Sequence, residues 1–176
     1  VSQRLAHLAG IHLLDPITNE YNIPYLSRYL SGFSITVVNL FYRTQGIITR
    51  KGNPKKIKDI SDFCRTDVTI VNRQEGSGTR VLLDTLIDNK GISRKSIKGF
   101  DTAVTTHIEL AAEIAKGSAD AGMGIQAAAQ AVDLDFIPLK DERYDIVLLN
   151  EYLSLRPVQA LFDIIRSDRF RLLLKG

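Results

Sequence analysis

The chain has 176 residues, 44% of them hydrophobic, which is enough to bury a core in one domain or in two small lobes. Its 23 basic and 20 acidic residues leave a net charge of only +3, so the composition does not favour a nucleic-acid-binding protein, which needs a clustered basic patch. Cys64 is the only cysteine, which excludes an internal disulfide bond and permits a reducing compartment.

No stretch is typical of a signal peptide or of a membrane span, so we expect a cytoplasmic protein without membrane insertion. Val1 is not a natural start, however, and a removed signal peptide would make a periplasmic or extracellular location possible. The lysines between positions 51 and 58 form the densest basic group, and we interpret them as part of a solvated loop.

The first third of the chain predicts two helices and several short strands from its apolar spacing and its turn residues. In chain order we expect a strand at 8–14, a turn at 15–16, a helix at 21–30, strands at 35–42 and 46–49, a turn at 51–54 and a short helix at 60–63.

From Val68 onward, strand and helix patterns alternate. We expect strands at 68–72, 97–100, 119–124, 135–139 and 144–150, and helices at 78–88, 106–116, 126–132 and 158–166. Such alternation predicts an α/β fold with mostly parallel sheets covered by helices.

The turn between the strand at 68–72 and the following helix contains Gly76, Ser77, Gly78 and Thr79. Either hydroxyl residue can cap the helix, and the glycines let the backbone approach a ligand closely. The first amides of a helix have no intrahelical partner and carry partial positive charge, so the turn is suited to an anion.

Arg73 and Arg80 bracket this turn and could add guanidinium groups, which match the geometry of oxyanions. The alternative is ordinary helix capping with two surface arginines. We favour an anion site because two arginines, two glycines and two hydroxyls occur together.

The motif Arg73-x-x-x-Ser77-Gly78-Thr79 resembles the oxyanion motif of phosphate- and tungstate-binding proteins with the type II periplasmic-binding-protein fold. Three further segments extend the resemblance over nearly the whole chain: His12-Leu-Leu-Asp15-Pro16, Arg43-Thr-Gln45-Gly46, and Ala119-Asp-Ala-Gly122-Met-Gly124-Ile125. Together they are similar to the branch found beside DNA-binding heads or fused to molybdopterin-biosynthesis enzymes.

The resemblance implies two lobes joined by crossing strands, with a ligand cleft between them. Lobe I would be residues 1–49 with 140–176, and lobe II would be residues 50–139. Related domains usually open with a further strand and helix, so the resemblance leaves open whether the first lobe is complete at the N-terminus.

Thr105 and Thr106 precede the helix at 106–116 and form either a second wall of amides and hydroxyls or a simple cap; we leave both open. The segment with His12 and Asp15 faces the cleft in the resembling family, and a self-contained turn is an equal alternative.

The run Gly122 to Ala127 matches the dinucleotide pattern G-x-G-x-x-A, which is weak evidence when it occurs alone. We interpret it as a tight turn whose backbone at Gly124 could touch a ligand. Arg43 and Gln45 would either line the cleft or brace the hinge.

The three histidines are scattered and no paired metal-ligand spacing occurs, so we expect neither a metal nor a cofactor. We conclude that the chain is a module that binds a small oxyanion such as molybdate or tungstate, without being an enzyme. Its partner would be an attached DNA-binding, biosynthetic or transporter component. The alternatives are an enzyme acting on a phosphorylated metabolite, a domain of molybdenum-cofactor biosynthesis, and a structural domain with a vestigial cleft.

Overall fold

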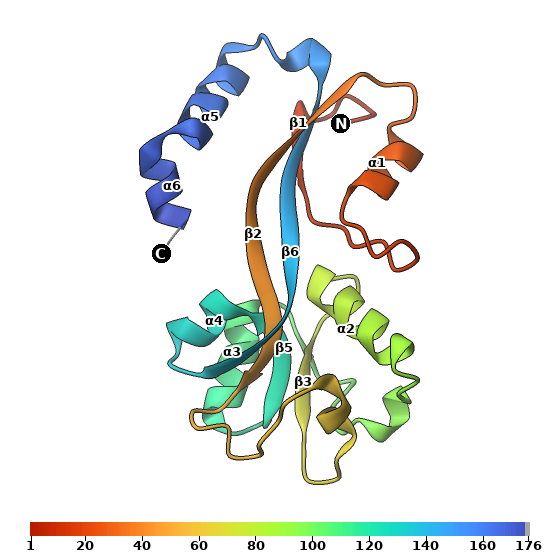
Figure 1. The fold of residues 1–176 in the computed structure, drawn as a ribbon, viewed down its shortest axis with the longest axis vertical. Helices are drawn as coiled ribbons and strands as arrows, with labels where there is room; N and C mark the ends of the chain where they lie inside the picture. The colour runs from red at the N-terminus through yellow and green to blue at the C-terminus, as the bar shows by residue number, and fades with distance from the viewer. Residues whose placement is uncertain (175–176) are drawn as a thin grey trace. The chain divides into compact units, whose positions relative to one another are not determined.

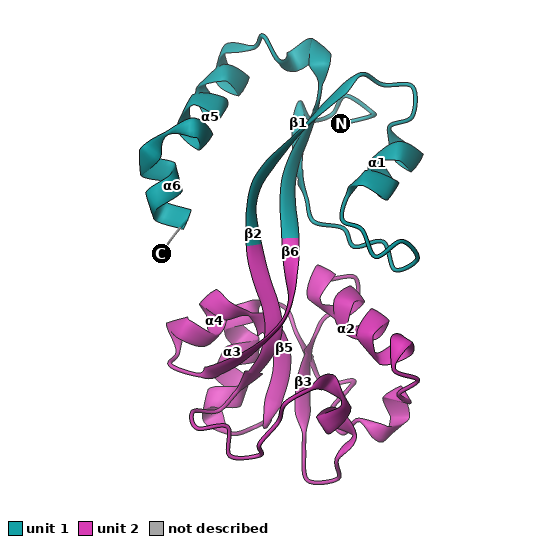
Figure 2. Ribbon diagram, in the orientation of Figure 1, with its two compact units in different colours: residues 1–42, 143–176 teal, residues 43–142 magenta. Residues whose placement is uncertain are grey.

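The computed structural model describes residues 1–174, and the chain divides into two compact units. Unit 1 consists of residues 1–42 and 143–176, and unit 2 of residues 43–142 (Figure 2). The boundaries lie inside two long strands rather than at their ends, at positions 42/43 and 142/143. Each unit is described by itself below.

The two long strands are β2 (Ile35–Thr49) and β6 (Asp135–Leu149). The sequence predicted two shorter strands in each place, because polar residues interrupt both apolar patterns. The structure corrects this: Arg43 pairs with Glu142, and Thr44 donates a hydrogen bond to Asp141 at 2.9 Å. These contacts satisfy the polar side chains, so each strand continues without a break.

Unit 1 contains β1 (Leu8–Ile11), which pairs antiparallel with β6. Helix α1 (Ile23–Tyr29) and helix α5 (Arg156–Arg166) contribute to its core together with β6. The two helices contribute to separate apolar clusters, one with Leu26, Leu30 and Val147 and one with Ile146, Leu148, Val158 and Phe162. Val147 lies between Ile146 and Leu148 in β6, and successive side chains of a strand point to opposite faces. The two helices therefore cover opposite faces of the sheet. Helix α6 (Asp168–Leu174) was not predicted.

The sheet of unit 2 is mixed, and its parallel part follows the strand–helix alternation that the sequence predicted. Strand β3 (Ile70–Arg73) runs parallel to β4 (Ala103–Val104) on one side and to β5 (Ala121–Ile125) on the other. Strand β2 pairs antiparallel with β5. The antiparallel pair arises because β2 brings the chain into the unit in the direction opposite to β3, β4 and β5.

Three helices cover the sheet of unit 2: α2 (Gly78–Asn89), α3 (His107–Lys116) and α4 (Gln126–Ala131). Helix α2 lies on one side of β3 and β5, and α3 and α4 lie on the other (Figure 1). Two 3₁₀ helices, η1 (Ile60–Cys64) and η2 (Arg94–Ser96), complete this unit, and η3 (Asn150–Tyr152) belongs to unit 1.

The strand predicted at 97–100 is absent, and η2 leads instead into a turn. Gly99 has a φ of +84°, and a Cβ atom there would overlap the carbonyl oxygen of Ile70. Ile97 and Phe100 are apolar because their side chains are buried in the core, and not because the backbone is extended.

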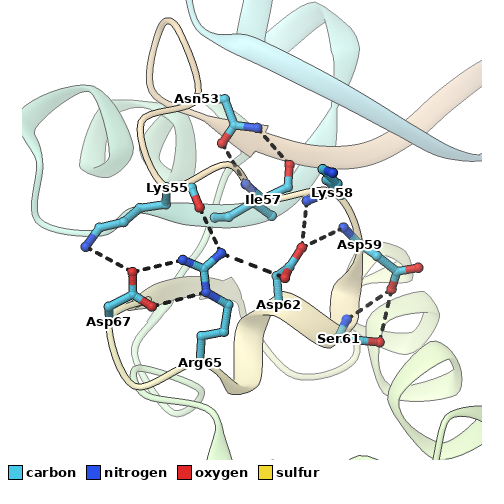
Figure 3. Close-up of polar contacts among 9 residues, drawn as sticks. All are labelled: Asn53, Lys55, Ile57, Lys58, Asp59, Ser61, Asp62, Arg65 and Asp67. Atoms are coloured by element: carbon cyan, nitrogen blue, oxygen red, sulfur yellow. Dashed lines mark hydrogen bonds and ion pairs between the residues drawn. The ribbon is translucent and has the colours of Figure 1, made fainter.

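The lysine-rich loop is neutralised locally, as a solvated loop would be (Figure 3). Arg65 makes two hydrogen bonds with the Asp67 carboxylate, at 3.1 and 2.9 Å, and Lys55 lies 3.7 Å from the same carboxylate. Lys51 pairs with Asp133 at 2.6 Å. Among the described residues, no helix is both long enough and apolar enough to span a membrane.

Candidate functional site at the carboxyl edge of the unit 2 sheet

The parallel strands of unit 2 end at one edge of its sheet. A helix begins after each of β3, β4 and β5, so the amino termini of α2, α3 and α4 gather at this edge. In α/β proteins, ligands bind at this kind of edge, where strand carboxyl ends and helix amino ends meet.

The turn after β3 presents backbone amides at this edge. Ser77 is the N-cap of α2, and its hydroxyl accepts a hydrogen bond from the Arg80 amide at 3.3 Å. Gly76 has a φ of +79°, and no atom lies within 4 Å of the position of a Cβ there. The amides of Gly78 and Thr79 donate to no acceptor among the described residues. These two donors are therefore available to an anion.

Arg73 is the last residue of β3 and is only 8% exposed. Its Nη2 donates a hydrogen bond to the carbonyl oxygen of Thr105 at 2.7 Å. Its Nε and Nη1 are buried, and within residues 1–174 neither has a hydrogen-bond partner. Buried polar groups are nearly always paired, so two orphan donors on one guanidinium need an explanation.

The electrostatic environment also leaves the Arg73 charge poorly compensated. Burial lowers the pKa of Arg73 from its ordinary value, and the charge of Arg43 lowers this pKa further. Glu109 acts in the opposite direction. The Glu109 carboxylate, however, is occupied at the start of α3, where it accepts hydrogen bonds from the amides of Thr105 and Thr106 at 2.9 and 3.0 Å.

Thr106 caps α3, which decides between the two threonines considered from the sequence. Its hydroxyl accepts from the Glu109 amide at 3.1 Å, and the Glu109 side chain completes a capping box. Thr105 contributes its carbonyl to Arg73. The pair thus positions the guanidinium at the edge, while a direct contact of either hydroxyl with a ligand stays a prediction.

Gln45, for which the sequence left open a place in the cleft lining or a role in bracing the hinge, is a further buried polar residue. Its side chain is fully buried, and neither Nε2 nor Oε1 has a hydrogen-bond partner among the described residues. It lies opposite Ile125, the last residue of β5, and therefore at the same edge as Arg73. Sequence could show a polar residue in a strand but not that its amide lacks partners.

Comparisons with known proteins decide the family. A family model described as "PBP superfamily domain" matches residues 1–166. The chain belongs to the PBP superfamily. It is 40% identical over 164 residues to the uncharacterized protein YvgK of Bacillus subtilis, covering 93% of this chain and 53% of that protein. The PBP domain thus spans about half the length of this relative.

Solved structures share the fold of this PBP domain at low sequence identity. The CcmR regulatory domain of Synechocystis PCC6803, solved in complex with 2-PG, has a TM-score of 0.65 and 13% identity over 93% of this chain and 73% of that one. The tungstate ABC transporter structure from Geobacter sulfurreducens has a TM-score of 0.65 and 14% identity over 94% of this chain and 74% of that one. These similarities establish a type II PBP-like fold.

Arg80 is held within the PBP domain by its own contacts. Its Nε donates to Asp84 at 3.1 Å, and its guanidinium lies 4.3 Å from the ring centre of Phe100. The alternative of a surface arginine is therefore wrong for Arg80, since the residue is 7% exposed. The prediction that Arg80 contacts the anion stays a prediction.

Gly124 lies within β5, so the tight turn expected around it is absent. A Cβ atom on Gly124 would come within 2.7 Å of the Ile48 side chain, and one on Gly122 within 3.1 Å of Leu110. Close packing of the strand therefore explains both glycines, and the G-x-G-x-x-A match needs no cofactor. Contact between a ligand and the Gly124 backbone stays a prediction.

His12 and Asp15 lie in unit 1. Asp15 is 3% exposed and accepts hydrogen bonds from the amides of Ile17 and Thr18 at 2.9 and 3.0 Å. The bond from Thr18 is the largest cause that lowers the pKa of Asp15 below 3.8. His12 stacks on Tyr144 with ring centres 5.2 Å apart. These contacts fit a self-contained turn, and a role in ligand binding stays a prediction.

Proposed function

We propose that this PBP domain binds a small oxyanion at the carboxyl edge of the unit 2 sheet, with Arg73 as the main charge partner. One observation carries the proposal: two N–H groups of the buried Arg73 guanidinium, Nε and Nη1, have no hydrogen-bond acceptor among the described residues. An oxyanion would supply both the missing acceptors and the missing negative charge.

The free-energy cost of burying an uncompensated charge supports the proposed anion site. A buried charge without a partner is expensive, and proteins retain such a group chiefly where function needs it. The free amides of Gly78 and Thr79 at the start of α2 add donors that are fixed before the ligand arrives. A few such contacts, each worth about 1–3 kcal/mol, suffice for micromolar binding, which corresponds to about −8 kcal/mol.

Molybdate and tungstate are the ligands that the family resemblance suggests. The fold similarity to a tungstate transporter structure supports this choice, and the similarity to a regulatory domain supports a role as a sensor attached to another component. We propose binding rather than catalysis because the carboxylate that acts on Arg73, that of Glu109, is already engaged in capping α3. The carboxylate of Glu142 likewise pairs with Arg43.

Calorimetric titration of molybdate, tungstate, sulfate and phosphate tests the proposal. Replacing Arg73 by alanine should weaken binding of the tightest of these anions by about 2–3 kcal/mol, or roughly thirty- to 160-fold, because charge-assisted contacts are lost. Arg65→Ala is a matched control, since it removes the same charge from unit 2 in a loop where Arg65 pairs with Asp67. Equal affinity in Arg73→Ala, or no heat with any anion, would refute the proposed site.

A further inference from the structure

The unpartnered amide of Gln45 carries an inference that rests on the proposed function and narrows the class of ligand. Gln45 is fully buried, and both its donor Nε2 and its acceptor Oε1 lack partners among residues 1–174. An anion can accept from Nε2, but Oε1 needs a hydrogen-bond donor. A buried acceptor that faces only anionic oxygens would stay unpaired and would repel them.

The sheet register places Gln45 beside the same strand end as Arg73. Strand β2 pairs Gln45 with Ile125, where β5 ends. On the other side of β5, Val71 pairs with Gly122, so the parallel register continued by two residues brings Arg73 alongside Gly124. The end of β5 is therefore flanked by Gln45 on β2 and by Arg73 on β3.

Strand alternation places the two side chains on opposite faces of the sheet. Ile48 and Val71 belong to the apolar cluster formed with α3 and α4. Because side chains alternate along a strand, Arg73 shares the face of Val71, whereas Gln45 points to the face opposite Ile48. That opposite face is the one covered by α2 (Figure 1). Gln45 thus shares its face with the helix whose first amides are free.

We propose that Gln45 is a specificity-determining residue, and that the ligand is an oxyanion carrying an O–H or N–H group beside its charged oxygens. Such a ligand, seated over the end of β5, would accept from Arg73 and from Nε2 of Gln45 while donating to Oε1. Hydrogen phosphate has this property. Sulfate, molybdate and tungstate carry no proton at neutral pH and cannot donate to Oε1 of Gln45, so each should bind less tightly than phosphate.

Phosphate and sulfate form a matched pair of probes, since both are tetrahedral and similar in size. Calorimetry on the complete chain at neutral pH should show phosphate binding about tenfold or more tightly than sulfate, because sulfate leaves a buried acceptor unpaired. Gln45→Met keeps the length of the side chain without its polar atoms. It should reduce the ratio of the two affinities to about one.

Thr49→Val is the control variant. Thr49 lies on the same face of β2, is 1% exposed, and pairs with Ala121 at the far end of β5. This variant should keep the preference for phosphate, and thermal unfolding of both variants would verify that each is folded. Tungstate provides a second unprotonated probe and should behave like sulfate.

The two proposals fail in different ways. If Arg73→Ala abolishes anion binding but Gln45→Met keeps the phosphate-to-sulfate ratio, the anion site stands and the role of Gln45 is refuted. The role of Gln45 is also refuted, and the anion site again stands, if the unmodified chain binds sulfate or tungstate as tightly as phosphate. If none of the anions binds, both proposals are wrong.

Discussion

At the scale of single residues, two buried polar side chains set this domain apart from an ordinary α/β core. Among the described residues, two N–H groups of Arg73 and the whole side-chain amide of Gln45 have no hydrogen-bond partner, although both residues are buried. Buried polar groups without partners lower stability, and they are commonly retained where they serve binding. A bound ligand offsets the loss by supplying the missing hydrogen-bond partners. Removing one of these groups should therefore affect stability and binding in opposite directions.

Arg73→Met tests this opposition. The substitution replaces a poorly compensated buried charge by an apolar chain of similar length, so the ligand-free protein should gain about 1 kcal/mol in free energy of unfolding. The same variant should lose the increase in unfolding temperature that a bound anion gives to the unmodified chain. Urea unfolding and thermal unfolding with and without phosphate measure the two effects. A less stable ligand-free variant would contradict the argument.

Ser77→Ala should have two smaller effects. Loss of the N-cap hydroxyl removes the acceptor of the Arg80 amide and should lower the free energy of unfolding by about 1 kcal/mol. Anion affinity should fall by about 1 kcal/mol or less, because the amides of Gly78 and Thr79 remain. Ser77→Gly is the comparison, since glycine at an N-cap costs only a few tenths of a kcal/mol.

At the scale of secondary-structure elements, close approach of strands shapes the edge. Gly46 faces Gly124 across the β2–β5 pair, and a Cβ on Gly46 would overlap the carbonyl oxygen of Ile137 and meet the Phe136 ring at 2.7 Å. The glycine therefore permits the path of β6 past β2 within unit 2. Gln45 is the neighbour of this glycine, so its position depends on the same close contact.

Gly46→Ala should consequently lower the free energy of unfolding by about 3 kcal/mol, because the added methyl group meets backbone that cannot move aside. Gly52→Ala is the matched control: Gly52 has a φ of +76° with no atom near a Cβ, so only backbone strain of about 1 kcal/mol is expected. Denaturant unfolding of both variants gives the comparison. Similar losses for the two would show that the Gly46 contact is easily relieved.

At the scale of the whole molecule, many acidic groups are stabilised in their charged form. Hydrogen bonds from Arg65 lower the pKa of Asp67, backbone amides lower those of Asp15 and Asp59, and Arg94 lowers that of Asp88. Since each of these pKa values lies below 3.8 when the chain is folded, the folded state binds fewer protons than the unfolded state in this range. Stability from these groups is full above about pH 4 and is lost as pH falls.

The free energy of unfolding should therefore decrease steeply as pH is lowered below about 4. Asp67→Asn removes one contributing carboxylate and should make this decrease shallower, while lowering stability at neutral pH because Arg65 loses one of its charged partners. Urea unfolding at a series of pH values measures both changes. An unchanged slope would mean that the ion pair of Asp67 with Arg65 does not contribute to acid sensitivity.

The sequence by itself determined the α/β class, most helices and the helix start at Ser77, because apolar spacing and capping residues act on a few neighbouring positions. It also predicted an anion site at Arg73 and the glycine-rich turn. Only the tertiary structure showed that β2 and β6 are continuous, that Gly124 lies in a strand and that Arg80 is paired. It also showed that the Gln45 amide and the Nε and Nη1 groups of Arg73 have no hydrogen-bond partner within residues 1–174. These properties depend on contacts between residues tens of positions apart. Local patterns carry no information about which distant donor and acceptor will meet.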